Sequence, residues 1–174
     1  MEMHKNASDK YTIMTVCTGN ICRSPMAEII LQSYVDREGL QDRVRVISSG
    51  VSDEEDGNPI DRRAVKVLRD RGYEIPAYHR AHRVTRDEIA QTDLFLPMTA
   101  SHMRALLRQI PDGKRSEVHM YRSFDPALPT PARGDESRID LVDPWYGGPH
   151  EFEVAIDQIE EVAPYIIEWV KKQL

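Results

Sequence analysis

The amino-acid sequence predicts an α/β fold: a three-layer sandwich in which helices cover both faces of a doubly wound, four-stranded parallel sheet. Two observations predict this class. Short apolar runs, of the length of buried strands, alternate with stretches whose apolar residues recur at helical spacing. Strands joined through helices form parallel sheets with right-handed crossovers. At 174 residues, the chain is long enough for one domain with a buried core.

The strands and helices are predicted in alternation along the chain. Four apolar runs indicate strands, at residues 12–16, 44–48, 94–98 and 118–121, of which the last is the shortest. Apolar residues at helical spacing, or local capping signals, indicate helices over residues 61–71, 100–110 and 152–170, one from Pro25 to near Gly39, and a short one opening at Thr85.

Local signals predict how several of these helices begin and bend. Ser24 is expected to cap the first helix and Pro25 to occupy its first position, where the missing N–H costs nothing. Thr85 and Glu88 have the spacing of a capping box. Pro164 is expected to kink the last helix, because proline removes one of its hydrogen bonds.

The chain is predicted to hold a single domain over residues 11–174. Residues 1–10 are polar and are expected to form a disordered or poorly ordered extension. Residues 123–142 show no clear periodicity and predict a long loop. Loops of this length in compact domains often have a function.

Composition narrows the class of protein. A formal net charge of −6 argues against non-specific nucleic-acid binding, which needs a basic surface. The first ten residues lack the apolar core of a signal peptide, and no apolar run is long enough for a membrane span. The only two cysteines lie in one short segment, so they cannot staple the fold. We therefore expect a cytoplasmic protein without membrane or nucleic-acid partners, and a monomer.

Residues 17–25, Cys-Thr-Gly-Asn-Ile-Cys-Arg-Ser-Pro, indicate an anion site that contains a nucleophile. The segment follows a predicted strand and leads into a helix, so that its backbone N–H groups and the helix dipole favour a bound oxyanion. Arg23 supplies a planar fork for two oxygen atoms. Cys17 is placed where these groups favour its thiolate. Attack by Cys17 on a phosphate monoester would give a phosphocysteine.

A leaving alkoxide or phenoxide also needs a proton donor. Residues 143–148, Asp-Pro-Trp-Tyr-Gly-Gly, are the best candidate segment. Asp143 there is an acid on a loop, and Trp145 and Tyr146 are apolar walls suited to an aromatic substrate ring. Once deprotonated, the same carboxylate could activate water to hydrolyse the phosphocysteine.

The two segments together resemble those of the low-molecular-weight protein tyrosine phosphatases, with a likeness to the bacterial members. The resemblance implies the fold predicted above, a phosphate-binding loop after the first strand, and hydrolysis of phosphotyrosine in proteins. It implies no cofactor and no metal, with inorganic phosphate or similar oxyanions as product or inhibitor.

The resemblance also implies a role for each matching residue. Cys17 would be the nucleophile, Arg23 the phosphate clamp and Asp143 the general acid. The phosphate- and substrate-binding residues would be Thr18, Gly19, Asn20, Ile21, Cys22, Ser24, Trp145 and Tyr146. Asn20, Ser24 and His79 would support the loop, and Ser24 would stabilise the thiolate. Cys22 would form a reversible disulfide with Cys17 that prevents its over-oxidation.

Three features depart from the family pattern. Residues 52–56 form an acidic rim where members often carry an aromatic residue. Thr99 stands where many carry an aspartate. The segment 129–141 is longer than usual, which bears on how Asp143 approaches the site.

Other activities remain open at this stage. A protein arginine phosphatase of the same family would carry threonine between Asn20 and Cys22, whereas this chain has Ile21. An arsenate reductase of the same fold would need further cysteines. A phosphate-binding module without activity fits poorly with an intact cysteine, arginine and acid. The remaining histidines show no metal-ligand spacing and are expected on the surface or in loops: His4, His82, His102, His119 and His150.

Overall fold

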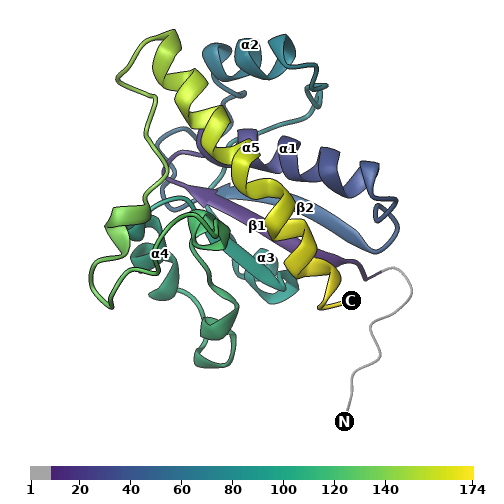
Figure 1. Ribbon diagram of the computed structural model, residues 1–174, viewed down its shortest axis with the longest axis vertical. Helices are drawn as coiled ribbons and strands as arrows, with labels where there is room; N and C mark the ends of the chain where they lie inside the picture. The colour runs from purple at the N-terminus through teal and green to yellow at the C-terminus, as the bar shows by residue number, and fades with distance from the viewer. Residues whose placement is uncertain (1–8) are drawn as a thin grey trace.

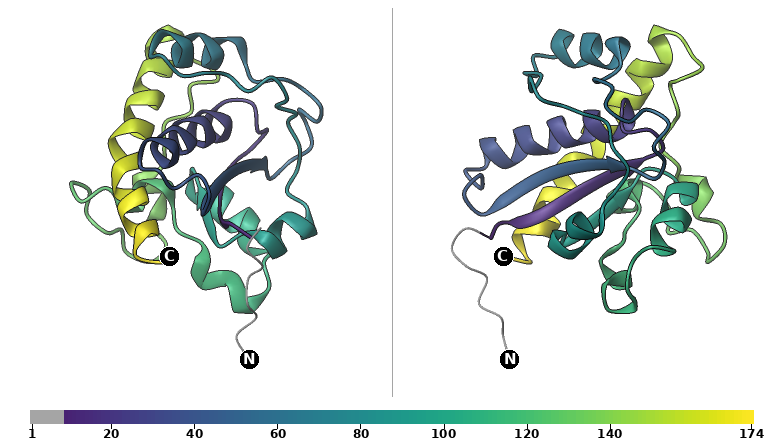
Figure 2. Two further views of the ribbon diagram at one scale, coloured as in Figure 1. Left: turned by 90° about the vertical axis from the view of Figure 1, so that its right-hand side faces the viewer. Right: turned by 180° about the vertical axis from the view of Figure 1, so that it is seen from behind.

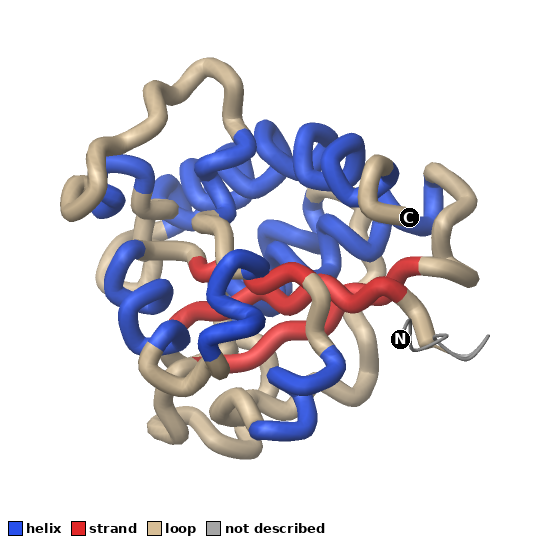
Figure 3. The backbone as a smooth tube through the Cα atoms, turned by 90° about the horizontal axis from the view of Figure 1, so that it is seen from below, coloured by secondary structure: helices blue, strands red, loops and turns tan. Residues whose placement is uncertain are grey.

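The computed structural model describes residues 9–174, so the predicted extension falls mainly on residues outside the described part, as does His4. Three parallel strands form the sheet in the order β2–β1–β3. Their bounds are β1 Tyr11–Cys17, β2 Val44–Gly50 and β3 Leu94–Pro97. The three strand predictions are confirmed, and Figure 3 shows the strands in the interior, between helices.

Helices connect the strands and continue beyond them. The α-helices are α1 Arg23–Arg37, α2 Arg62–Asp70, α3 Arg86–Gln91, α4 Ala100–Leu107 and α5 Pro149–Lys171. Three short 3-10 helices lie between α4 and α5: η1 Asp112–Glu117, η2 Tyr121–Phe124 and η3 Glu136–Ile139. None of the helices within residues 9–174 combines the length and the apolar character that crossing a bilayer requires.

Apolar residues pack on both faces of the sheet. Ile13 and Met14 are neighbours in β1 but belong to different clusters, because successive strand residues point to opposite faces. The cluster of Ile13 includes α1 and α5, and the cluster of Met14 includes residues of α3 and α4. Figures 1 and 2 show the same division of the helices. The doubly wound prediction fits this arrangement, and the count of three layers stays a prediction.

The prediction of a fourth strand at residues 118–121 is wrong. Val118 makes only an isolated parallel bridge with Phe95, and the N–H of His119 donates to the carbonyl of Phe95. The chain then turns into η2, because the fully buried Tyr121 points its hydroxyl to the carbonyl of Ile159 in α5, 2.8 Å away. That contact needs the chain to leave the sheet edge.

The helix predictions are mostly confirmed, with one displaced start. Thr85 and Glu88 form the predicted capping box of α3. The last helix, α5, continues through Pro164, and its predicted kink stays a prediction. The first helix starts at Arg23, with Cys22 at its N-cap position, so the predictions that Ser24 caps it and that Pro25 is its first residue are wrong.

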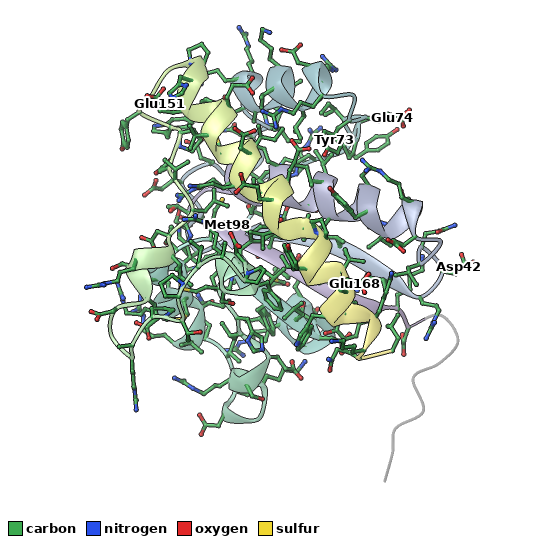
Figure 4. The ribbon with its side chains drawn as sticks, viewed as in Figure 1. Asp42, Tyr73, Glu74, Met98, Glu151 and Glu168 are labelled. Carbon is green, nitrogen blue, oxygen red and sulfur yellow. The ribbon has the colours of Figure 1, made fainter. Side chains whose placement is uncertain are left out.

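The carboxyl ends of the strands gather the functional segments, as expected for a parallel sheet. Cys17 and Gly50, the last residues of β1 and β2, are paired in register. Beyond β3, the carbonyl of Met98, labelled in Figure 4, accepts the N–H of Leu141 at 2.9 Å. This bond attaches the long segment 123–142 to the sheet edge, directly before Asp143.

Candidate active site

Residues 17–24, here called the cysteine loop, connect β1 to α1 at the carboxyl edge of the sheet. Cys17 is only 4% exposed and lines a cavity of about 220 Å³. No side chain caps α1, which leaves the first N–H groups of the helix available to an anion. The displaced helix start therefore has a chemical use: it brings Arg23 into the first turn, beside the cavity that it also lines.

Asn20 adopts a left-handed backbone conformation, with φ of 61°, and it is buried. Its Nδ2 donates to the hydroxyls of Ser24 and Ser48, both at 2.9 Å, and its Oδ1 accepts the N–H of His82 at 3.3 Å. Asparagine tolerates this conformation better than most residues. These bonds fix the turn from inside, so Asn20 shapes the cavity without being among the side chains that line it.

The Ser24 hydroxyl lies 3.0 Å from the Cys17 sulfur. Because it accepts a hydrogen bond from Asn20, its own hydrogen is free to point to the sulfur or to the carbonyl of Ser49, 3.3 Å away. Donation to the sulfur would stabilise a thiolate. Ser24 thus lies behind Cys17 rather than in the cavity.

His79 supports the cysteine loop from outside. Its Nε2 donates to the backbone carbonyl of Asn20 at 2.8 Å. Burial holds the pKa of His79 below its usual range, against the hydrogen bond, which raises it. The imidazole is therefore neutral at pH 7, with its proton on Nε2, and it is suited to structural support.

The candidate acid faces the same cavity from residues 143–148, here called the acid loop. An Asp143 carboxylate oxygen lies 3.4 Å from a guanidinium nitrogen of Arg23, with side chains 46% and 7% exposed respectively. Arg23 also donates to the carbonyl of Leu141 at 3.2 Å, and Asp143 accepts the N–H of Trp145 at 3.0 Å. Of these two cavity-lining side chains, the carboxylate is thus half-exposed and the arginine buried.

Aromatic and acidic side chains complete the cavity wall. Trp145 and Tyr146 line it, and Tyr146 is 92% exposed. Glu54 and Glu55, from the predicted acidic rim, also line the cavity. Of the predicted site residues, the cavity lining includes Cys17, Thr18, Gly19, Ile21, Cys22, Arg23, Asp143, Trp145 and Tyr146.

The sequence model of the family described as "Low molecular weight phosphotyrosine protein phosphatase" matches residues 12–174. The chain belongs to this family. The prediction made from the cysteine and acid segments is confirmed, and the protein is a phosphatase of the low-molecular-weight type.

Individual phosphatases are similar to this chain in sequence and in fold. Low molecular weight protein-tyrosine phosphatase A of Mycobacterium tuberculosis is 41% identical over 167 residues, which cover 96% of each chain. A protein tyrosine phosphatase of Entamoeba histolytica has the same fold, with a TM-score of 0.84 at 24% identity over 94% of this chain and 99% of that one. The arginine phosphatase YwlE is also similar, with a TM-score of 0.77 and 28% identity, covering 92% and 96%.

The phosphatase carries one buried histidine at its site that sequence reasoning missed. His102, expected on the surface or in a loop, lies in α4 and is 3% exposed. Its Nε2 is 2.8 Å from the hydroxyl of Thr18 in the cysteine loop. Burial, together with the charge of Arg23, lowers the pKa of His102 to about 3. A neutral imidazole therefore orients the hydroxyl of Thr18 at the cavity edge.

The other described histidines differ in setting. His82 pairs with Glu88 at 2.8 Å, which raises the pKa of His82 to about 9. His119 lies in a loop, as expected, and packs half-buried against the rings of Phe124 and Trp169. His150 is exposed, as expected. No sequence signal distinguished His102, because only the packing of α4 against the cysteine loop brings it to the site.

Both cysteines of the phosphatase are free thiols that line the cavity. Burial, and then the charge of Asp61, raises the pKa of Cys22 far above its usual range. Cys22 is therefore a neutral thiol under the conditions in which the phosphatase would act. Within residues 9–174, no group of three or more histidine, cysteine, aspartate or glutamate side chains is arranged to hold a metal ion.

Proposed function

We propose that this phosphatase hydrolyses phosphotyrosine in proteins through a covalent intermediate on Cys17. The observation that carries the proposal is that Asp143, from a distant part of the chain, lines the same cavity as Cys17 and Arg23 of the cysteine loop. The established family supports the same reaction class.

In the first step, the Cys17 thiolate attacks phosphorus as the bond between phosphorus and the phenolic oxygen breaks. The non-bridging oxygens accept hydrogen bonds from the backbone of the cysteine loop and from Arg23. Asp143, protonated, gives its proton to the departing phenolic oxygen. The products are a phosphocysteine at Cys17, a free tyrosine side chain and an Asp143 carboxylate.

In the second step, the Asp143 carboxylate accepts a proton from water while the water oxygen attacks phosphorus. The bond between sulfur and phosphorus breaks, and its electron pair returns to Cys17 as the thiolate. Inorganic phosphate leaves, and Asp143 is again protonated for the next cycle. Ser24, 3.0 Å from the sulfur, stabilises the thiolate in both steps.

The proposal of tyrosine rather than arginine as the dephosphorylated residue rests on the cavity wall. Ile21, Trp145 and Tyr146 offer apolar surface to an aromatic ring. The arginine phosphatase alternative keeps one argument in its favour, because Glu54 and Glu55 lie where a guanidinium would find opposite charge.

The direct test compares turnover of matched phosphotyrosine and phosphoarginine peptides by the wild-type chain, with Cys17→Ser as the inactive control. We expect the tyrosine peptide to give the higher kcat/KM, and Cys17→Ser to reduce turnover by about 10⁴-fold or more, as removal of an enzyme nucleophile does. A higher kcat/KM for the phosphoarginine peptide would show that phosphotyrosine is not the preferred substrate. Activity retained in Cys17→Ser would contradict the covalent mechanism.

Two further expectations belong to this proposal. Residues 11–174 act as one phosphatase domain, a monomer in the cytoplasm that releases inorganic phosphate. Cys22 forms a disulfide with Cys17 when an oxidant such as hydrogen peroxide converts the Cys17 thiolate to a sulfenic acid; the Cys22 thiol displaces water, and an external thiol later reduces the disulfide. That both thiols line one cavity supports this pairing.

A further inference from the structure

Arg63, in the first turn of α2, contacts the acid loop but has no part in the chemistry above. We propose that Arg63, held by Asp61, is a positioning residue that fixes the acid loop and so sets how efficiently Asp143 transfers its proton. The inference rests on the proposed function, because it takes Asp143 as the proton donor.

Arg63 touches the acid loop just beyond Asp143. Its Nη1 donates to the backbone carbonyl of Trp145 at 3.1 Å and to that of Gly147 at 3.5 Å. The guanidinium carbon lies 5.3 Å from the centre of the Trp145 ring and 4.7 Å from that of Phe152 in α5. The Arg63 side chain thus contacts the backbone of the acid loop, the ring of Trp145 in the cavity wall, and Phe152 in the first turn of α5.

Asp61 holds the guanidinium in place. Its two carboxylate oxygens accept from Nε and Nη2 of Arg63, at 3.1 and 3.2 Å. Burial by itself would raise the pKa of Asp61, but hydrogen bonds and charge from Arg63 outweigh burial and hold the pKa below its usual range. Asp61 therefore stays ionised, and the pair has the two-point geometry that makes arginine–carboxylate contacts directional.

The same aspartate is tied to the cysteine loop. The N–H of Asp61 donates to the carbonyl of Ile21 at 2.9 Å, and the Asp61 carboxylate also caps α2 by accepting the N–H of Arg63 at 2.8 Å. The contacts therefore run from the cysteine loop through Asp61 and Arg63 to the acid loop. They relate the position of Asp143 to that of the nucleophile through a helix end, without using Arg23.

The acid loop is otherwise lightly attached. Arg23 contacts the Asp143 carboxylate, and Glu151, labelled at the start of α5 in Figure 4, accepts the N–H of Gly148 at 2.7 Å. Gly147 must be glycine here, because a Cβ at that position would collide with the Glu151 side chain. Figure 1 shows α2 beside the start of α5, where the acid loop ends. Arg63 of α2 therefore contacts both the acid loop and Phe152 in the first turn of α5.

An arginine is required by this geometry. Nε and Nη2 are used by Asp61 while Nη1 reaches the carbonyls, so one planar group serves both partners at once. A lysine ammonium is a single point of charge and cannot span them. The Arg63 side chain is 41% exposed, so its loss should loosen the acid loop rather than unfold the protein.

The experiment measures the dependence on leaving-group pKa for the full chain, using a series of aryl phosphates. In Arg63→Gln we expect kcat/KM for p-nitrophenyl phosphate to stay within about threefold of wild type, because a good leaving group needs little proton transfer. For phenyl phosphate we expect a fall of about tenfold, part of the 10²–10⁴ that general acid catalysis supplies. Turnover numbers should fall for both, since Asp143 also activates water in the second step.

Controls separate positioning from general damage. Arg62→Gln removes an exposed charge from the neighbouring position of the same helix and should behave as wild type. Arg63→Lys keeps the charge and should resemble Arg63→Gln. Asp61→Asn keeps a helix-capping side chain but weakens the contact with the Arg63 guanidinium. We therefore expect a smaller fall in kcat/KM for phenyl phosphate than in Arg63→Gln. Asp61→Asn also serves as the second variant if Arg63→Gln folds poorly.

A combination with Asp143→Asn decides the outcome. If Arg63 acts through Asp143, adding Arg63→Gln to Asp143→Asn should not alter the leaving-group dependence any further. Equal losses of kcat/KM with every aryl phosphate, or additive losses of kcat/KM in the double variant, would overturn the positioning role. Failure of Asp143→Asn itself to steepen the dependence would instead count against the proposed function.

Discussion

The cysteine loop and the acid loop meet at one cavity but are built in opposite ways. Cys17, Asn20 and Ser24 are buried, and their side chains are hydrogen-bonded to each other and to the end of β2. In the acid loop, Asp143 is half-exposed and Tyr146 almost fully exposed. The proposed phosphate-binding loop is therefore fixed by buried hydrogen bonds, whereas the proposed proton donor, Asp143, lies on a loop with few contacts to the rest of the protein. Preorganised donors avoid reorganisation during reaction.

The largest effect expected within this comparison comes from Asp143→Asn. It removes the proposed proton donor and leaves the buried cysteine loop intact, so we expect kcat/KM for phenyl phosphate to fall by about 10²–10³-fold and that for p-nitrophenyl phosphate by much less. Steady-state kinetics with the two substrates checks it. Equal falls for both would mean that Asp143 supports the site without donating a proton.

Asn20→Ala should reduce activity uniformly, without the dependence on leaving group expected for Asp143→Asn. It removes the bonds to Ser24 and Ser48, each worth about 1 kcal/mol, and places alanine in a left-handed conformation. We expect kcat/KM to fall about 10- to 100-fold with good and poor leaving groups alike, and the urea midpoint to fall. Asn20→Gly relieves the backbone strain alone, so recovery of activity in that variant would show that the side-chain bonds are unimportant.

A smaller effect concerns stability against pH. The pKa of His102 is lowered to about 3 in the folded state from 6.5, so the unfolded chain binds this proton first as the pH falls. His102 therefore destabilises the fold progressively below about pH 6.5, by up to about 1.4 kcal/mol for each pH unit down to pH 3. Urea unfolding of wild type and His102→Gln between pH 7 and 4.5 measures this.

The pH comparison isolates His102 from the other titrating groups. His82 works in the opposite sense, because its pKa is raised to about 9 and its contribution is lost only as the pH rises toward that value. Since His82 is present in both proteins, the difference between them reports His102. A difference in stability that stays constant from pH 7 to 4.5 would contradict the buried, neutral assignment.

Much of the site could be predicted, because most of its candidate residues lie in two short segments, 17–25 and 143–148. The order of cysteine, glycine, arginine and proline over residues 17–25 indicated a loop between a strand and a helix, and the structure has that loop. The start of α1 was predicted too late, because Ser24 is a good capping residue by itself. In the fold its hydroxyl is used by Cys17 and Asn20 instead.

The missed residues share one property. His102 reaches Thr18, and Arg63 reaches Trp145, across distances in sequence that no local pattern spans. The missing fourth strand has the same origin, since Tyr121 leaves the sheet edge for a partner in α5. Local propensity carries no information on such partners.

Residue type and near neighbours in the chain were enough to predict the alternation of strands and helices. They were also enough to identify Cys17, Arg23 and Asp143 as the candidate nucleophile, phosphate clamp and acid. The folded structure was needed to show that three strands form the sheet within residues 9–174, that His102 is buried and neutral, and that Asp61 and Arg63 connect the two loops. These depend on which distant segments pack together, and burial and packing set the pKa values and the hydrogen-bond partners.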